Sequence, residues 1–518
     1  MEAAVIPGAD ALVLTAAHSG VRVCFANPGT TEMPLVAALD RVPGVRAVLG
    51  LQENVCTGAA DGFARISGHP AMTLLHLGPG LANGLANLHN ARRAHTPVVN
   101  LVGDHASWHL PYDAPLTSDI DALAATVGTV HVVPDRTSVG DVTRRAIEGA
   151  HRLQGISTII VPADHQQRNA VEPPAEPANI TTRAHIPEDR IHKVAKHLRD
   201  SRSRPVILLG GNALSRAAQQ AAWRIASSTG ARLFCETFPA RAERGAGLPN
   251  IDRLPYFPEQ AVAALKDASA VVVAGAEEPV AYFGYEGIPS VLASPGAIVE
   301  LARPTEDAET ALLELDGILG GTTSSAASTS QPEQPDDSAV LTGAAIGQVV
   351  AAGLPDDAIV SVEGGTSGYP FYTASASAAA HTVLTNTGGA IGQGLPCALG
   401  AAIAAPDRPV VALQSDGSGL YTAQALWTMA RERCNVTVLI AANHSYNVLR
   451  TELARHGNSD FGPQATALTS LADPNIDWVA LANGFGVGAS RVARVAELRK
   501  ALDNAIAIDG PHLIEMTI

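Results

Sequence analysis

Short apolar runs alternate along the chain with longer segments that have helical spacing or are rich in small residues. The apolar runs at 45–50 and 71–76 are each followed by such a segment, at 53–66 and 81–94. Strands that alternate with helices predict a parallel sheet covered by helices on both faces. Because the alternation recurs at 205–301 and again at 340–516, we predict an α/β protein with three doubly wound parallel-sheet domains.

Two stretches interrupt this pattern and predict linkers. Residues 171–179 hold three prolines in nine positions, and residues 320–338 are rich in Ser, Thr and Pro. We therefore predict domains at 1–170, 188–319 and 339–518, joined by linkers at 171–187 and 320–338.

The segment 414–446 is the most informative part of the chain. Apolar runs at 410–413 and 436–441 flank a predicted helix, 421–433, so that Asp416 follows one strand and Asn443 the next. Ligands bind at the carboxyl ends of parallel strands, and hard oxygen donors suit Mg²⁺. The small residues after Asp416 would let backbone N–H groups approach a diphosphate. The alternative is an ordinary strand–helix turn in which Asp416 caps the helix.

Composition excludes several classes of partner. Apolar residues make up 46% of the 518 and charged residues 16%, with a formal net charge of −15. This balance argues against nucleic acid and against anionic membrane surfaces. The five cysteines are scattered without a Cys-x-x-Cys pair, which predicts buried free thiols in a reducing compartment. With no signal-peptide pattern and no apolar run of membrane-spanning length, we predict a cytoplasmic protein.

Four blocks of sequence resemble the thiamine diphosphate-dependent 2-oxoacid enzymes, in particular benzoylformate decarboxylase and the acetolactate synthase large subunit. SDGS followed by AN resembles the family motif GDGS followed by NN. FANPGTTE (25–32), LQENVCTGAADGFAR (51–65) and LLHLGPGLANGLANLHNA (74–91) resemble three consecutive blocks of the pyrimidine-binding domain. The resemblance spans the chain in the order pyrimidine, middle and diphosphate domain. It implies thiamine diphosphate and Mg²⁺ as cofactors and a homodimer at minimum, commonly a homotetramer.

The resemblance implies three catalytic residues. Glu53 matches the glutamate that hydrogen-bonds the cofactor pyrimidine, where a carboxyl in an apolar site supports removal of the thiazolium C2 proton. Thr30 stands where a serine contacts the substrate carboxylate, and His76 matches an acid/base histidine. Without the resemblance, Glu53 is a glutamate favoured by a helix dipole and His76 a strand-end histidine.

The remaining site residues implied by the resemblance bind the cofactor. The metal ligands are Asp416, Asn443 and the backbone carbonyl of Ser445. The other cofactor-binding positions are Gly365, Thr366, Gly389, Ile391, Gly417, Ser418 and Tyr446.

This chain departs from the family pattern near the substrate. Ser415 replaces the first glycine of GDGS, where a requirement for positive φ would strain a serine. The second catalytic histidine of benzoylformate decarboxylase has no counterpart, because Tyr282, Phe283 and Tyr285 occupy that region. Glu452 stands where that enzyme has an aromatic residue. His105 and His109 could replace the missing histidine or could be loop histidines.

The reaction therefore stays open between two outcomes, a decarboxylase that releases an aldehyde and a carboligase that joins two carbonyl compounds. A catalytically weak cofactor-binding paralogue that assembles with a synthase subunit is the alternative. A third hypothesis is a flavin or nicotinamide oxidoreductase that uses the turn at 210–212. That turn lacks a complete G-x-G-x-x-G motif, so we expect no FAD. The side chain of the 2-oxo acid is not predicted.

Overall fold

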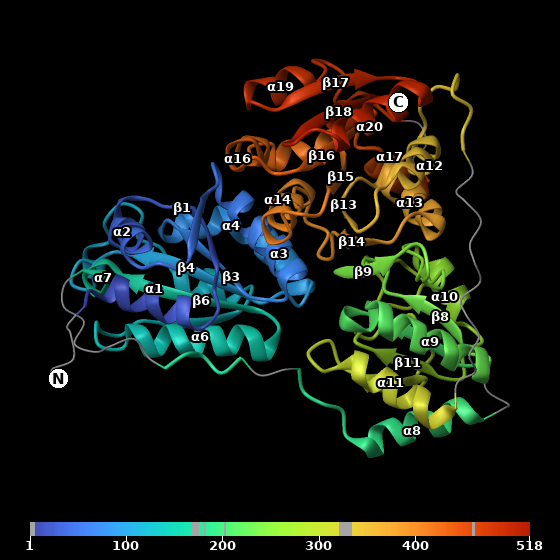
Figure 1. The fold of residues 1–518 in the computed structure, drawn as a ribbon, viewed down its shortest axis with the longest axis horizontal. Helices are drawn as coiled ribbons and strands as arrows, with labels where there is room; N and C mark the ends of the chain where they lie inside the picture. The colour runs from blue at the N-terminus through green and yellow to red at the C-terminus, as the bar shows by residue number, and fades with distance from the viewer. Residues whose placement is uncertain (1–5, 168–175, 181–182, 201–203, 321–333, 458–460) are drawn as a thin grey trace.

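The structure is a computed structural model that describes residues 6–167, 176–180, 183–200, 204–320, 334–457 and 461–518. Three β-sheets, each with helices on its faces, form the N-terminal, middle and C-terminal parts of the chain (Figure 1). Residues 171–175 and 181–182 of the first predicted linker and 321–333 of the second lie outside the described residues, and the domain boundaries stay a prediction. Among the described residues, no helix has the length and apolar character needed to cross a membrane.

The N-terminal sheet has six strands in the order β2-β1-β3-β4-β6-β5, all parallel. Its strands are β1 Val23–Asn27, β2 Arg46–Leu49, β3 Ala71–Leu75, β4 Val98–Asp104, β5 Thr129–Val132 and β6 Ile156–Pro162. One face is covered by α1 (Gly8–His18), α2 (Met33–Arg41) and α6 (Val139–Leu153). The other face is covered by α3 (Glu53–Ser67), α4 (Leu77–Arg93) and α5 (Ile120–Ala125).

The middle sheet has five parallel strands in the order β10-β8-β7-β11-β12. They are β7 Val206–Leu209, β8 Arg232–Cys235, β10 Asp252–Arg253, β11 Val271–Ala274 and β12 Ile298–Ala302. Helices α8 (Glu188–Arg199), α9 (Arg216–Thr229) and α11 (Ala308–Leu319) cover one face, and α10 (Pro258–Leu265) covers the other.

The C-terminal sheet has seven strands in the order β17-β18-β16-β15-β13-β14-β9. They are β13 Ala358–Val362, β14 His381–Thr385, β15 Val410–Ser415, β16 Val436–Ala442, β17 Gly488–Val492, β18 His512–Thr517 and β9 Arg241–Arg244. Helices α12 (Gly343–Gly353), α13 (Gly365–Ala374) and α20 (Val495–Ile506) cover one face, and α14 (Gly394–Ala404), α16 (Ala425–Glu432) and α19 (Trp478–Gly484) the other.

The three parallel sheets confirm the predicted fold class, with one addition. Strand β9 comes from the chain segment predicted as the middle domain, yet it pairs antiparallel with β14 at the edge of the C-terminal sheet. It covers an edge that would otherwise expose unpaired backbone groups.

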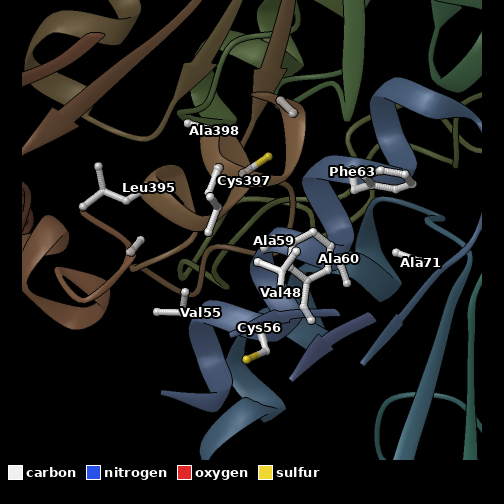
Figure 2. Packing of buried hydrophobic residues seen from close by; sticks show 14 of the residues in the cluster. Val48, Val55, Cys56, Ala59, Ala60, Phe63, Ala71, Leu395, Cys397 and Ala398 are labelled. Carbon is white, nitrogen blue, oxygen red and sulfur yellow. The ribbon is translucent and has the colours of Figure 1, made fainter. Parts of the chain in front are cut away.

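Helices α3 and α14 pack against each other and join the N-terminal and C-terminal parts (Figure 2). A Cβ on Gly62 would lie 2.1 Å from the Cys397 carbonyl oxygen, and one on Gly400 would lie 1.9 Å from that of Ala59. Only glycine allows the two backbones to approach this closely. The buried Arg65 adds polar bonds, to Asp61 at 2.6 Å and to the Thr385 carbonyl at 2.7 Å. Because Glu53 begins α3, this packing also positions Glu53.

Two predicted elements differ from the structure. The segment expected after the apolar run at 71–76 starts earlier than residue 81, because α4 begins at Leu77. A proline at position 79 is tolerated there, since the first turn of a helix needs no N–H from it. The predicted helix at 421–433 is shorter, because a 3₁₀ turn, Leu420–Thr422, precedes α16.

Candidate active site

Asp416 and Asn443 follow adjacent parallel strands, as predicted. Strands β15 and β16 pair with Ser415 opposite Ala441, and α15 (Asp416–Gly419) begins directly after β15. Asp416 is buried, and its carboxylate accepts hydrogen bonds from the backbone N–H groups of Gly417 (2.9 Å) and His444 (2.7 Å). Burial raises the pKa of Asp416. A nearby cation would therefore stabilise its charged form.

The turn after β16 contains polar atoms without partners. The Asn443 Oδ1 accepts a hydrogen bond from the Ser445 backbone N–H at 3.0 Å, and His444 between them has φ +51°. The Ser445 Oγ and the His444 Nδ1 are buried without a hydrogen-bond partner in the described part of the chain. Such orphaned atoms fit a site that a polar ligand completes.

The oxygen atoms at these strand ends suit Mg²⁺ that is bound partly by a phosphate ligand, rather than by protein side chains alone. Among the described residues, no group of three or more His, Cys, Asp and Glu side chains could hold a metal ion. Asp416 supplies one carboxylate, and the neighbouring turn supplies amide and carbonyl oxygens. Mg²⁺ is commonly bound by one or two carboxylates together with phosphate oxygens and water. The residues present therefore fit Mg²⁺ only in company with a bound diphosphate.

The other predicted diphosphate residues surround the same strand ends. Gly365 and Thr366 form the first turn of α13 after β13, and the Thr366 Oγ1 accepts a weak hydrogen bond from Asn443 Nδ2 at 3.4 Å. The Tyr446 ring lies beside Gly417. Ser418 donates a hydrogen bond to Gln414 at 2.6 Å.

Ser415 carries no backbone strain. Its φ is −104°, so the position does not require glycine. Its hydroxyl points toward Gly364, since a Cβ on Gly364 would lie 3.0 Å from the Ser415 Oγ. The serine thus faces the turn that contains Gly365 and Thr366.

Glu363, which is half-buried, and Gln414, which is buried, form a polar pair that the sequence did not single out. The Glu363 carboxylate accepts hydrogen bonds from Gln414 Nε2 at 2.6 Å and from the backbone N–H groups of Gly392 and Gly394 at 2.5 Å each. Gln414 in turn bonds Ser418. Burial raises the pKa of Glu363. The pair joins the turns after β13, β14 and β15, which are three of the four turns that contain the predicted cofactor residues.

The turn with Gly389 and Ile391 rests on α4 of the N-terminal part. Asn90 exchanges hydrogen bonds with both backbone groups of Ala390, and Asn87 donates one to the Gly392 carbonyl at 3.2 Å. Gly389 has φ +80°, a conformation that favours glycine, and Ile391 is half-buried.

Glu53 lies at the start of α3 and is 9% exposed. Gln52 caps this helix, because its side chain accepts a hydrogen bond from the Val55 N–H at 3.2 Å. Asn83 of α4 donates a hydrogen bond to Glu53 Oε2 at 3.1 Å. One turn further along α4, Asn87 bonds the turn after β14, so α4 connects Glu53 to the Gly389 region.

His76 follows β3 and contacts a buried glutamate. The Nδ1 atom of His76 lies 2.8 Å from Glu32 Oε2 and 3.3 Å from the Thr31 hydroxyl. Thr30 is exposed, so the hydroxyl that faces His76 in the structure belongs to Thr31. Glu32 escaped the sequence analysis, because its partner lies 44 positions away along the chain.

The structure therefore collects the predicted residues in two groups. Glu53, His76 and Thr30 lie at the N-terminal sheet, and the predicted diphosphate and metal residues lie at the C-terminal sheet, with the Gly389 turn hydrogen-bonded to α4. Within the described ranges, no hydrogen bond links Glu53 or His76 to Asp416, Asn443 or Ser445.

Both groups fall within segments that match known family models. Residues 6–125 match the model described as "Thiamine pyrophosphate enzyme, N-terminal TPP binding domain", and residues 365–516 match the corresponding C-terminal domain. A Mycobacterium tuberculosis protein named "Putative acetolactate synthase large subunit IlvX" is 48% identical over 514 residues, which cover 99% of each chain. The chain belongs to the thiamine diphosphate-dependent enzymes.

Other members of this enzyme family are more distant in sequence. Benzoylformate decarboxylase of Pseudomonas aeruginosa is 28% identical over 532 residues, which cover 96% of each chain. The solved structure of a 4-hydroxybenzoylformate decarboxylase from Rhodococcus jostii superimposes with a TM-score of 0.85 at 24% identity, over 98% of each chain. Benzoylformate decarboxylase of Polynucleobacter necessarius gives 0.85 at 21% identity, over 99% of this chain and 98% of its own. At these identities the two superpositions establish a shared fold.

In this thiamine diphosphate enzyme, aromatic residues stand in the region without the second histidine. The Tyr282 hydroxyl donates a hydrogen bond to the Thr387 carbonyl at 3.0 Å, and its ring lies beside Gly389. Burial raises the pKa of Tyr282 to about 12, so its hydroxyl stays protonated near neutral pH. Tyr282 therefore does not alternate between its protonated and charged forms near neutral pH, as a histidine can. His105 and His109 pack on each other in the loop after β4, with ring centroids 5.6 Å apart.

The Gly-Gly-Asn turn of the middle sheet is covered by an acidic side chain. A Cβ on Gly210 would lie 2.5–2.7 Å from the Glu236 carboxyl atoms. A dinucleotide phosphate bound at this turn would have to displace the Glu236 carboxyl group. Burial, reinforced by Glu277, raises the pKa of Glu236 to about 8. This arrangement agrees with the expected absence of FAD, which stays a prediction.

Replacing Glu236 by glutamine should stabilise the protein at alkaline pH. The folded state holds the Glu236 proton more tightly than the unfolded chain does. The stabilisation that protonated Glu236 gives the folded state is therefore fully present below pH ~4.5 and is lost as pH rises through ~8. The urea concentration at the midpoint of unfolding should therefore be higher for Glu236→Gln than for wild type at pH 9, and similar for the two proteins at pH 5. The exposed Glu278 provides the control, since Glu278→Gln should change neither midpoint. An equal gain at both pH values would contradict the prediction.

Proposed function

We propose that the protein is a Mg²⁺-dependent thiamine diphosphate enzyme that decarboxylates a 2-oxo acid. The observation that supports this most is the pairing of Asp416 with the orphaned polar atoms of the turn 443–445 at adjacent strand ends. Bound thiamine diphosphate would supply the electron sink that lets a 2-oxo acid lose CO₂. The names of the relatives agree, since they include decarboxylases of benzoylformate and acetolactate synthases.

Each predicted site residue has a defined task in this proposal. Asp416, Asn443 and the Ser445 carbonyl would hold Mg²⁺. The diphosphate would contact Gly365, Thr366, Gly417, Ser418 and Tyr446, and the pyrimidine would contact Gly389 and Ile391. Glu53 would share a proton with the pyrimidine ring. His76 would exchange a proton near the substrate, and Thr30 would bind the substrate carboxylate.

The fate of the decarboxylated product depends on proton supply. A decarboxylase must protonate it to an aldehyde, whereas a carboligase joins it to a second carbonyl compound. Because the second catalytic histidine is absent, His76 is the proton-transfer group that the proposal retains. This favours ligation over rapid protonation, although both outcomes belong to the proposal.

The assembly and location are part of the proposal. A homodimer, in which Glu53 of one subunit serves the diphosphate site of the other, would join the two groups of residues; a homotetramer is the expected larger form. We propose a cytoplasmic location, because the five cysteines are free and buried, as is typical of proteins in a reducing compartment.

The alternative function is a weakly active cofactor-binding paralogue that assembles with a synthase subunit. The absent second histidine favours it. The unstrained Ser415 weakens it, because the diphosphate turn needs no glycine at that position.

A panel of 2-oxo acids tests the proposal. The protein is incubated with thiamine diphosphate, Mg²⁺ and 2-oxo acids from pyruvate to branched and aryl compounds, with and without an aldehyde acceptor. We expect CO₂ release from at least one of them. A free aldehyde would identify a decarboxylase, and a 2-hydroxyketone or an acetohydroxy acid a carboligase. No CO₂ from any substrate would overturn the proposal in favour of the paralogue.

A further inference from the structure

Glu32 is a fully buried carboxylate with three hydrogen bonds, in the 3₁₀ turn Thr30–Glu32 that follows β1. Its Oε2 accepts from the Gly29 backbone N–H at 2.9 Å and lies 2.8 Å from His76 Nδ1. Its Oε1 accepts from the Thr31 hydroxyl at 2.7 Å. An ionised carboxylate only accepts hydrogen bonds, so His76 Nδ1 must be the donor.

The backbone around this pair is shaped to bring the two side chains together. A Cβ on Gly29 would fall 2.1 Å from His76 Nδ1, and a Cβ on Gly103 would fall 1.9 Å from Glu32 Oε1. Any side chain at either position would displace the imidazole or the carboxylate. Leu77, directly after His76, is fully buried with φ +45°, a conformation that is strained for a non-glycine residue. Backbone strain of this kind is typical of functional sites.

The other ring nitrogen of His76 remains available. Among the described residues, no group hydrogen-bonds His76 Nε2, and the side chain is 24% exposed whereas Glu32 is 0% exposed. A proton held on Nδ1 by Glu32 leaves Nε2 with a lone pair in neutral His76. The negative charge of Glu32 also stabilises the imidazolium that forms when Nε2 takes up a proton.

We propose that Glu32 is a positioning residue that fixes His76 as the Nδ1–H tautomer and makes Nε2 the nitrogen that exchanges a proton with the substrate. This inference rests on the proposed function, in which His76 lies near the reacting atoms. The same arrangement accounts for how His76 could act without a second histidine. The Glu32 carboxylate would let His76 Nε2 accept a proton and later return it.

The test combines a tautomer measurement with kinetics. Protein labelled with ¹⁵N at histidine is examined by long-range ¹H–¹⁵N correlation, with His76→Gln to assign the His76 signals. In wild type, neutral His76 should have its proton on Nδ1. In Glu32→Ala, which lacks the acceptor, the proton should move to Nε2. In Glu32→Gln, the amide oxygen can still accept from Nδ1–H while its NH₂ faces Thr31, so the tautomer should be retained without the charge.

Kinetics separate positioning from a general role in folding. We expect both Glu32 variants to lower kcat by about 10- to 100-fold, the range seen for partners that orient a functional histidine, with Glu32→Ala lower than Glu32→Gln. The KM and the affinity for thiamine diphosphate should change less than twofold. The matched control is the exposed His185–Glu314 pair at 2.9 Å, where Glu314→Gln should leave kcat unchanged.

Two outcomes would overturn the inference: a proton on Nε2 of neutral His76 in wild type, or a tautomer and kcat in Glu32→Gln and Glu32→Ala that equal those of wild type. If Glu32→Ala fails to fold, the wild-type spectrum and Glu32→Gln still decide. The tautomer is measured without turnover. An inactive wild-type protein with Nδ1–H would therefore refute the proposed function and leave the positioning of His76 supported.

Discussion

Replacing Glu53 by glutamine is expected to lower kcat by about 10²- to 10⁴-fold, the usual contribution of a positioned acid or base. Glutamine keeps the length of the side chain and an oxygen that accepts the Asn83 hydrogen bond, so α3 and its cap should stay intact. It cannot share a proton with the cofactor pyrimidine. Binding of thiamine diphosphate, measured by calorimetry in the presence of Mg²⁺, should therefore change little while turnover collapses.

A second glutamate distinguishes this role from a helix-dipole effect. Glu188 also begins a helix, α8, and is exposed. If Glu53 only stabilised a helix start, Glu53→Gln and Glu188→Gln would both have small effects on stability and none on kcat. Exchange of the cofactor C2 proton with solvent deuterium gives a readout that needs no substrate, and it should slow in Glu53→Gln alone. Wild-type turnover in that variant would refute the role of Glu53.

The parts of the site that the sequence predicts correctly are those encoded by local pattern. Asp416 and Asn443 each follow a continuous apolar run, and two such runs joined by a helix are adjacent in a parallel sheet, so their proximity follows from order along the chain. Glu53 stands between an apolar run and a helical segment, which predicts its place at a helix start, whereas its role in catalysis comes from the family resemblance alone. The structure confirms that Glu53 is the first residue of α3.

The parts that the sequence does not predict depend on contacts between distant segments. Glu32 meets His76 across 44 positions, and Glu363 meets Gln414 across 51. A glutamate in a strand-end turn looks the same in the sequence whether solvent or a histidine faces it. Strand β9 was missed for a related reason: its four residues, two of them arginine, lack an apolar run, and pairing with β14 is what makes them a strand.

Replacing Asp416 by asparagine is expected to weaken the Mg²⁺-dependent binding of thiamine diphosphate by more than about 100-fold. Loss of a residue that only orients a ligand costs about 10- to 100-fold in metal affinity, and Asp416 would be a ligand itself. It is also the only charged group that the turns at 416–418 and 443–446 offer, apart from His444. Asparagine keeps the size of the side chain and one oxygen, so the loss should be one of charge. Calorimetric titration of the cofactor at several Mg²⁺ concentrations measures it.

An aspartate at another helix start provides the matched control. Asp477 caps α19, where its side chain accepts a hydrogen bond from the Ala480 N–H at 3.0 Å, and asparagine caps helices equally well. Asp477→Asn should therefore leave cofactor affinity unchanged. If Asp416 were merely such a cap, Asp416→Asn would bind the cofactor like wild type, and the same result would follow if wild-type binding proved independent of Mg²⁺. Either finding would remove the metal from the proposed function, whereas a loss confined to Asp416→Asn that scales with Mg²⁺ would assign the ion to the carboxyl ends of β15 and β16.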